Sequence, residues 1–192
     1  MTGRTHDLAA FTALTLTFIW LPVLPPMSLA TAVVAFGANF VGGLFPDIDQ
    51  PTSDFWDNFR LGPFIAKIIC PAFGGHRHIS HSLVGVVFIG SLSYLILGAL
   101  APLILINMNI VWASFMIGMI SHLISDLPTK EGLPLFWPVR WKIGIPPFRW
   151  MRIEAGEWVE NFIIFPGLLL FNAYLLISNK EKVLLFLKLF LK

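Results

Sequence analysis

Charged residues are scarce in this sequence. Asp, Glu, Lys and Arg make up 12% of the 192 residues, whereas hydrophobic residues make up 56%. An ordinary soluble domain is roughly 25% charged, and a soluble protein with half of that would expose apolar surface that promotes association. Disorder requires the opposite balance, low hydrophobicity with high charge. The composition excludes both classes, and the net charge of +2 is too small to indicate a nucleic-acid partner.

Cysteine is almost absent as well. The single Cys70 excludes an internal disulfide and a zinc site built from several cysteines. The chain also has no evident internal repeat and no low-complexity linker. We therefore expect a single domain over residues 1–192.

Three long stretches contain no charged residue at all: 8–46, 82–125 and 161–179. Each is long enough for one or two membrane helices of about 20 residues, and prolines divide the first two. The sequence therefore predicts an all-α, polytopic membrane helix bundle with five spans. The expected elements are spans at 8–24, 27–45, 82–104, 110–127 and 161–178, loops at 47–80 and 128–160, and an interfacial tail at 180–192.

Five spans also predict the sidedness of the chain. The N-terminus and both long loops lie on one side of the membrane, together with most Lys and Arg residues, while the hairpin loops carry none. The positive-inside rule makes this the cytoplasmic side of a bacterial-type inner membrane, although four lysines in the tail count against it. An alternative for the N-terminus is a signal peptide, with an apolar stretch at 8–21 and Ala-Thr-Ala at 30–32 as its cleavage site.

All five histidines lie on the predicted cytoplasmic side, close to three aspartates at the ends of spans. Mixed His and carboxylate ligands suit zinc first, and also manganese or iron. The number of ligands is sufficient for one or two divalent ions at the membrane interface. The expected metal ligands are His6, Asp47, Asp49, His76, His81, His122 and Asp126.

His122 and Asp126 are four residues apart, which places them one turn apart on one helix face. They can bind one cation together, or they can form a hydrogen bond that satisfies two buried polar groups. Ionisable residues inside a span are costly and indicate function. Asp126 also lies at a helix C-terminus, where the helix dipole disfavours a carboxylate by about 0.3–1 kcal/mol. A divalent cation would compensate for both costs.

His81 lies at a helix N-terminus, for which we expect Ser80 as the N-cap. The positive end of the dipole favours the neutral imidazole that binds metals. An alternative is that His76, His78 and His81 are polar residues at headgroup level. Asp47 and Asp49 have an alternative too, an Asx-turn that ends the second span.

The 128–160 loop combines tryptophans with basic residues. An aromatic belt with snorkelling bases explains most of them, but bases such as Lys130 and Arg140 can also hold an anionic substrate group. Glu154, Glu157 and Glu160 precede the last span, where acidic residues are favourable caps. Glu160 is nearest the span and is the best placed of the three to face the site.

These motifs resemble the YdjM-type family, described as membrane-bound, metal-dependent hydrolases, some of them LexA-regulated. The matching stretches are Leu44-Phe-Pro-Asp-Ile-Asp49, Gly75-His-Arg77, His81-Ser-Leu83, Ser121-His122 through Asp126 to Thr129, Trp137-Pro138 and Gly156 to Glu160. His78 stands where the family usually has Gly, and Ser80 where it usually has Thr. The H-x-x-x-D pair also resembles, more distantly, the all-helical zinc-dependent phospholipase C and single-strand nuclease group, which favours phosphoester chemistry.

The leading hypothesis is a membrane-bound, metal-dependent phosphohydrolase that acts on a lipid or lipid-linked phosphate. A metal-activated water is the expected nucleophile, and Arg77 is expected to stabilise phosphate charge. Glu160 is a candidate ligand or base, and the resemblance adds Thr129 to the candidate site. One alternative is a phosphatidic-acid-phosphatase-like enzyme with a His nucleophile, although its Pro-Ser-Gly-His motif is absent. The other is a divalent-metal transporter or sensor, for which binding near the midplane is typical.

Overall fold

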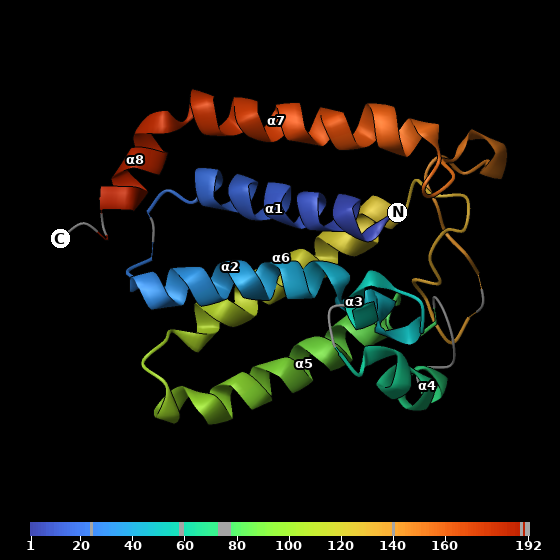
Figure 1. Ribbon diagram of the computed structural model, residues 1–192, viewed down its shortest axis with the longest axis horizontal. Helices are drawn as coiled ribbons and strands as arrows, with labels where there is room; N and C mark the ends of the chain where they lie inside the picture. Colours follow the sequence, from blue (N-terminus) through green and yellow to red (C-terminus); the bar gives the residue numbers. More distant parts are fainter. Residues whose placement is uncertain (24, 58–59, 73–77, 140, 189, 191–192) are drawn as a thin grey trace.

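Helices form nearly all the regular structure of this protein. The computed structural model describes residues 1–23, 25–57, 60–72, 78–139, 141–188 and 190. Within them the chain forms eight α-helices and no β-strand, with two isolated β-bridges. Helix α1 lies between α2 and α7, and α6 crosses behind α1 and α2 (Figure 1). The five long helices are α1 (Gly3–Trp20), α2 (Leu29–Leu44), α5 (Leu83–Leu100), α6 (Met108–Asp126) and α7 (Phe165–Ser178).

Four helical segments among the described residues are long and apolar enough to cross a membrane: Leu29–Asp49, Leu83–Leu103, Met108–Asp126 and Glu160–Ser178. They lie within a few residues of four predicted spans, which confirms an all-α membrane bundle. The first predicted span, 8–24, corresponds to α1, which starts five residues earlier and does not meet the same criterion. The reason is composition, since α1 includes Arg4 and Asp7 and buries Thr5, Thr12 and Thr15.

The polar face of α1 is turned into the bundle. Thr12 accepts a hydrogen bond from Nδ2 of Asn172 in α7, over 2.7 Å, and α1 also packs on α2 and α6. A helix that buries hydroxyl groups against its neighbours has a lower hydropathy than one that faces lipid all round. A span at 8–24 therefore stays a prediction, and α1 runs within the same bundle as the other long helices (Figure 1).

The contact between α2 and α6 is the most extensive in the fold, and glycines make it possible. A Cβ added at Gly42 would lie 2.1 Å from the Phe115 carbonyl oxygen, and one added at Gly118 would lie 2.0 Å from the Asn39 carbonyl oxygen. Any side chain at these positions would push the two backbones apart. This close approach brings the last turn of α6 beside the end of α2.

The predicted 47–80 loop is largely helical. The chain continues from α2 into a 3₁₀ turn, η1 (Phe45–Asp49), and then forms α3 (Asp54–Asp57) and α4 (Gly62–Ala72). Ile48, Trp56, Ala66 and Cys70 form a small buried cluster. The sequence predicted a loop over 47–80. These helices were missed because segments this short are stabilised by packing on the bundle rather than by their own helix propensity.

The 128–160 segment is irregular, as expected, but it is well connected. Backbone hydrogen bonds join Leu133 to Ile143 and Lys130 to Ile153. The guanidinium of Arg152 donates to the carbonyl oxygens of Gly144, Pro146 and Pro147. Arg152 thus organises the loop and is not available as an anion-binding base.

The two ends of the bundle differ. The N-terminus, α3, α4 and the 128–160 segment lie at one end (Figure 1). The hairpin connections lie at the other, with α8 (Lys180–Lys188), where Nζ of Lys182 donates to the Ile19 carbonyl oxygen at the end of α1. This is the grouping of loops that the sequence predicted. The end that holds the N-terminus, α3, α4 and the 128–160 segment is called the centre end below. Its cytoplasmic orientation stays a prediction.

Candidate metal centre

Four segments converge at the centre end: the start of α1, the η1 turn, the residues that precede α5, and the last turn of α6. They bring together one group of possible ligands from His6, Asp47 and His122 and a second from His81, His122 and Asp126. In each group the ligand atoms lie within 4.8 Å of one another. His122 belongs to both groups and therefore stands at the middle of the candidate centre.

The hydrogen bonds of His122 determine which of its nitrogens can bind a metal. Nδ1 lies 2.7 Å from the Gly43 carbonyl oxygen, which can only accept, so Nδ1 carries the hydrogen. The neutral ring then turns the lone pair of Nε2 toward Asp47 Oδ1 at 3.6 Å and Asp126 Oδ2 at 3.8 Å. These distances exceed a hydrogen bond. The alternative of a simple His122–Asp126 hydrogen bond is therefore wrong.

His6 is oriented in the same way by a hydroxyl group. The Ser125 hydroxyl donates its hydrogen to the His122 carbonyl oxygen over 2.8 Å. It must therefore accept from Nδ1 of His6, which lies 2.8 Å away. Nε2 of His6 then faces Asp126 Oδ1 at 3.4 Å. Within the described part of the chain, Nε2 of His6 and Nε2 of His122 have no hydrogen-bond partner.

His81 has a carboxylate behind it. The Ser80 hydroxyl donates to Asp49 Oδ2 and lies 3.0 Å from Nδ1 of His81, while Nε2 of His81 faces Asp47 Oδ1 at 3.5 Å. Asp49 therefore stands on the Nδ1 side of the ring and belongs to neither ligand group. A carboxylate in this place sets the tautomer of a metal-binding histidine. Asp49 is thus placed to orient a ligand, whereas the sequence analysis expected it to be one.

Ser80 is not the N-cap of α5. The cap is Ser82, whose hydroxyl accepts from the Gly85 amide over 3.0 Å. The expectation of Ser80 was wrong because the helix begins two residues later. Ser80 is free of that role, and its hydroxyl connects Asp49 to His81 instead.

The charges at the centre favour a cation. Burial lowers the pKa of His81, but its hydrogen bonds with Asp47 and Asp49 and their negative charges outweigh burial and raise that pKa to about 9. The α-ammonium group of Met1 donates to Asp126 Oδ1. The rings of His6 and His122 stack with centroids 3.6 Å apart. Positive charge is therefore favoured beside Asp47 and beside Asp126, the two carboxylates that face Nε2 atoms of the histidines.

One side of the centre is more open than the rest. The side chain of Asp47 is 17% exposed, whereas those of His6, His81, His122 and Asp126 are 0–1% exposed. Asp47, in the η1 turn, is therefore the most exposed of the five candidate ligands.

The η1 turn is held by residues that the sequence analysis did not select. Nε1 of Trp56 and Sγ of Cys70 both donate to the Ile48 carbonyl oxygen at 3.2 Å, and the Ser53 hydroxyl donates to the Asp47 carbonyl oxygen at 2.8 Å. These contacts fix the backbone on either side of the Asp47 side chain. No sequence signal pointed to them, because they depend on how α3 and α4 fold back on the turn.

Glu160 and Thr129 are buried but lie outside both ligand groups. The Glu160 carboxylate accepts from the amide and hydroxyl of Thr2 at 2.7 and 2.6 Å and from the Gly156 amide at 2.7 Å. It joins the start of α7 to the segment that carries His6. The Thr129 hydroxyl donates to the Asp126 carbonyl oxygen at 2.7 Å. Both contacts support the ligand-bearing segments, and direct catalytic roles for these residues stay predictions.

Three predicted residues lie outside the described residues, namely the expected ligand His76 and the expected phosphate-binding bases Arg77 and Arg140. Among the described candidates, His78 is half-buried and in neither ligand group. Lys130 forms an ion pair with Glu154 at the surface.

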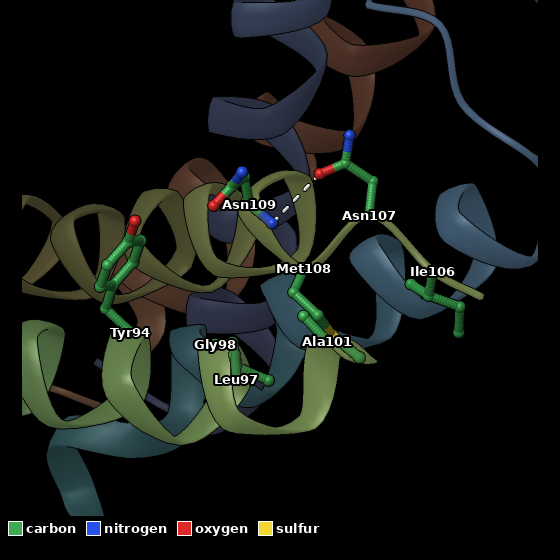
Figure 2. Close-up of a pocket in the computed structure, with 8 residues that line it drawn as sticks. All are labelled: Tyr94, Leu97, Gly98, Ala101, Ile106, Asn107, Met108 and Asn109. Atoms are coloured by element: carbon green, nitrogen blue, oxygen red, sulfur yellow. Dashed lines mark hydrogen bonds between the residues drawn. The ribbon is translucent and has the colours of Figure 1, made fainter. Parts of the chain in front are cut away.

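A pocket of about 290 Å³ lies at the opposite end of the bundle (Figure 2). Its lining residues are Tyr94, Leu97, Gly98, Ala101, Ile106, Asn107, Met108 and Asn109. None of them is acidic, basic, a histidine or a cysteine, so the lining offers none of the usual protein ligands of a transition metal. Among the described residues, both groups of possible metal ligands lie at the centre end.

Apolar helices of spanning length and a buried cluster of His and Asp side chains together define an integral membrane protein with a candidate metal centre. A family model described as YdjM inner membrane protein matches residues 1–190. The chain therefore belongs to the YdjM family, and it is an integral inner-membrane protein.

Two relatives illustrate the similarity. The inner membrane protein YdjM of Escherichia coli (strain K12) is 34% identical over 122 residues, which cover 62% of this chain and 56% of that protein. The uncharacterized protein YvsG of Bacillus subtilis (strain 168) is 32% identical over 177 residues, 91% of this chain and 93% of that protein. The match to YdjM thus spans little more than half of that relative's length. No solved structure matches the chain.

Proposed function

We propose that this protein is a membrane-bound, metal-dependent hydrolase that cleaves a phosphoester in a lipid or lipid-linked substrate. The supporting observation is the orientation of two imidazoles. His6 and His122 turn Nδ1 to protein acceptors and aim unpartnered Nε2 atoms, within the described part of the chain, at Asp47 and Asp126. Buried acceptors that face one another need a cation between them.

The donor set suits a divalent transition metal. Imidazole and carboxylate ligands favour zinc, with manganese or iron as alternatives, and two overlapping ligand groups accommodate one or two ions. His6, Asp47, His81, His122 and Asp126 would hold them. A bound ion would supply a Lewis acid that activates water and neutralises the charge of a phosphoester.

The other roles belong to the chain itself. Ser125 and Asp49 orient two of the imidazoles, and burial of His6, His81 and His122 excludes bulk water from their faces. Asp47 is the most exposed of the five candidate ligands, with 17% of its side-chain surface accessible. The nearly complete burial of the remaining groups leaves the side of Asp47 as the approach for a substrate.

The position of the centre supports a lipid substrate. Its ligands come from the ends of apolar helices, at the end of the bundle that also exposes Trp141, Trp150 and Trp158, with 72%, 80% and 62% of their surface accessible. Exposed tryptophans are typical of the headgroup layer of a membrane. A centre at that depth meets lipid headgroups, and by the positive-inside rule those of the cytoplasmic leaflet.

The same position argues against a transporter, because transporters bind their ions near the midplane of the membrane. Two measurements separate these functions: zinc uptake into proteoliposomes that contain the protein, and release of product from lipid substrates by the metal-loaded protein. Uptake without product release would favour a transporter and contradict a hydrolase.

The direct test uses protein purified into nanodiscs, with phosphatidic acid as a phosphomonoester and phosphatidylcholine as a phosphodiester. We expect zinc to co-purify, chelation to abolish release of phosphate or phosphocholine, and added zinc to restore it. The His122→Ala variant should bind little metal and be inactive. Full activity in metal-free wild-type protein would overturn metal dependence and favour a histidine nucleophile.

A further inference from the structure

We propose that helix α4 lies in the surface layer of the membrane, with one face in contact with anionic lipid and another against the η1 turn of the candidate centre. The helix has 11 residues, too few to cross a bilayer, which needs about 20. It lies at the centre end of the bundle (Figure 1). This inference does not depend on a metal or on hydrolysis.

The residues of α4 separate into three faces. The inner face carries Gly62, Ala66 and Cys70, four residues apart and all buried. A second face carries apolar side chains that nothing in the described part of the chain covers. They are Leu61, Phe64, Ile65 and Ile68, with 66%, 67%, 36% and 66% of their surface exposed. The third face carries exposed Pro63, Lys67 and Pro71.

This partition distinguishes between environments. A helix surrounded by water would not present four apolar side chains at i, i+3, i+4 and i+7 on its outer surface. A helix inside hydrocarbon would not carry an exposed lysine on another face. A helix at the boundary of lipid and water needs one apolar and one polar outer face. On α4 the four exposed apolar side chains are separated from the one exposed charge, Lys67, which lies between two prolines on the other outer face.

The surface around α4 supports lipid as the occupant. Helix α5 begins at the same end of the bundle, and its first turns expose Leu83, Val84 and Val87. The apolar face of α4 therefore lies at the same end as the apolar outer surface of a membrane-spanning helix. Exposed Arg60 and Lys67 flank that face and match the negative headgroups of anionic lipids.

The opposite face of α4 connects this surface to the centre. Cys70 donates to the Ile48 carbonyl oxygen, in the turn between Asp47 and Asp49. Asp47, the most exposed of the candidate ligands, belongs to this same turn. Lipid headgroups that contact the outer surface of α4 would thus meet a helix that packs on the ligand-bearing turn.

Spin labels on two faces of one helix test the proposal. Phe64→Cys and Ile68→Cys are compared with the matched control Lys67→Cys, each in a Cys70→Ala background that leaves a single cysteine. The proteins are reconstituted in vesicles of phosphatidylcholine and phosphatidylglycerol. We expect labels at positions 64 and 68 to be several-fold more accessible to oxygen than to chromium oxalate, and the reverse at position 67.

Equal access of chromium oxalate to positions 64, 67 and 68 would overturn the proposal, because the face would then be in water. Dipolar broadening at position 64 or 68 would overturn it too, since a second copy of the chain would then cover the face. If the Cys70→Ala background does not fold, the same positions are labelled in protein that retains Cys70, which is 4% exposed, with unsubstituted protein as the blank.

Discussion

The polar groups at the two ends of the bundle differ in whether they have partners. At the hairpin end, Asn107 Oδ1 accepts from the Asn109 amide at 3.2 Å (Figure 2) and from the Ile110 amide at 3.4 Å. The Thr31 hydroxyl accepts from the Asn107 amide at 3.1 Å. At the centre end, Nε2 of His122 faces oxygens of Asp47 and Asp126 and has no hydrogen-bond partner among the described residues. Polar groups that satisfy one another stabilise a fold, whereas a buried lone pair without a donor indicates a place for a ligand.

The comparison is tested most strongly by His122→Ala, which removes the residue shared by both ligand groups. Zinc affinity should fall by more than about 100-fold, because replacing a group that only orients a ligand already costs about 10–100-fold. Bound metal is measured by mass spectrometry and affinity by competition with a chelator. Asn107→Ala is the matched control at the hairpin end and should retain zinc. Equal metal content in the two variants would show that the ends do not differ as proposed.

Glycine substitutions compare how tightly the backbone is packed toward each end. At Gly118 a new Cβ would meet the Asn39 carbonyl oxygen at 2.0 Å, so Gly118→Ala should destabilise the protein by about 1–3 kcal/mol. At Gly98, beside the hairpin-end pocket, nothing among the described residues lies within 4 Å. Gly98→Ala should therefore be neutral or stabilise by about 0.4–1 kcal/mol. Thermal unfolding in detergent measures both, and a Gly118→Ala variant as stable as wild type would contradict the close approach of α2 and α6.

Ser125→Ala examines the orientation of His6. Without the hydroxyl, Nδ1 of His6 loses its acceptor, and Nε2 is no longer held toward Asp126. Zinc affinity should weaken by about 10–100-fold while the protein remains folded. Ser93→Ala is the control, since Ser93 donates only to the Gly90 carbonyl oxygen within α5. If both serine variants bind zinc like wild type, His6 is oriented by other contacts.

Asn107→Ala itself should affect stability and leave zinc binding unchanged. Loss of this N-cap of α6 should cost about 0.5–2 kcal/mol, seen as a lower melting temperature. Added zinc should stabilise the variant and wild type by the same increment, because the cap lies at the far end from the ligands. A zinc-dependent difference between the two would mean that the ends are coupled through α6.

The membrane spans and the ligand cluster could both be predicted from the sequence, for different reasons. The charge-free stretches around α2, α5, α6 and α7 reflect the cost of burying charge in hydrocarbon, which acts on composition alone. The sequence is a weaker signal for the polar helix α1, because its threonines are buried against the helices beside it. Asp47, His81, His122 and Asp126 were recognisable because ionisable residues at the ends of such spans are costly without a partner.

Which residues of the cluster face the other ligands and which orient them could not be predicted from the sequence. Asp47 and Asp49 are two residues apart in a symmetrical motif, yet only Asp47 faces the other ligand atoms, while Asp49 stands behind His81. Ser125 and Trp56 showed no local pattern that relates them to metal binding. The amphipathic face of α4 was present in the sequence as a spacing of apolar residues, but it lay within a segment expected to be a loop.

The sequence alone establishes that the chain is a membrane helix bundle and that its histidines and aspartates gather on one side, because these properties follow from the cost of placing charge in lipid. The tertiary structure establishes which nitrogen of each imidazole faces the centre and which carboxylate lies in front of or behind a ring. These features depend on hydrogen bonds between segments far apart in the chain, such as His122 to Gly43 and His6 to Ser125. No periodicity within one segment encodes such contacts.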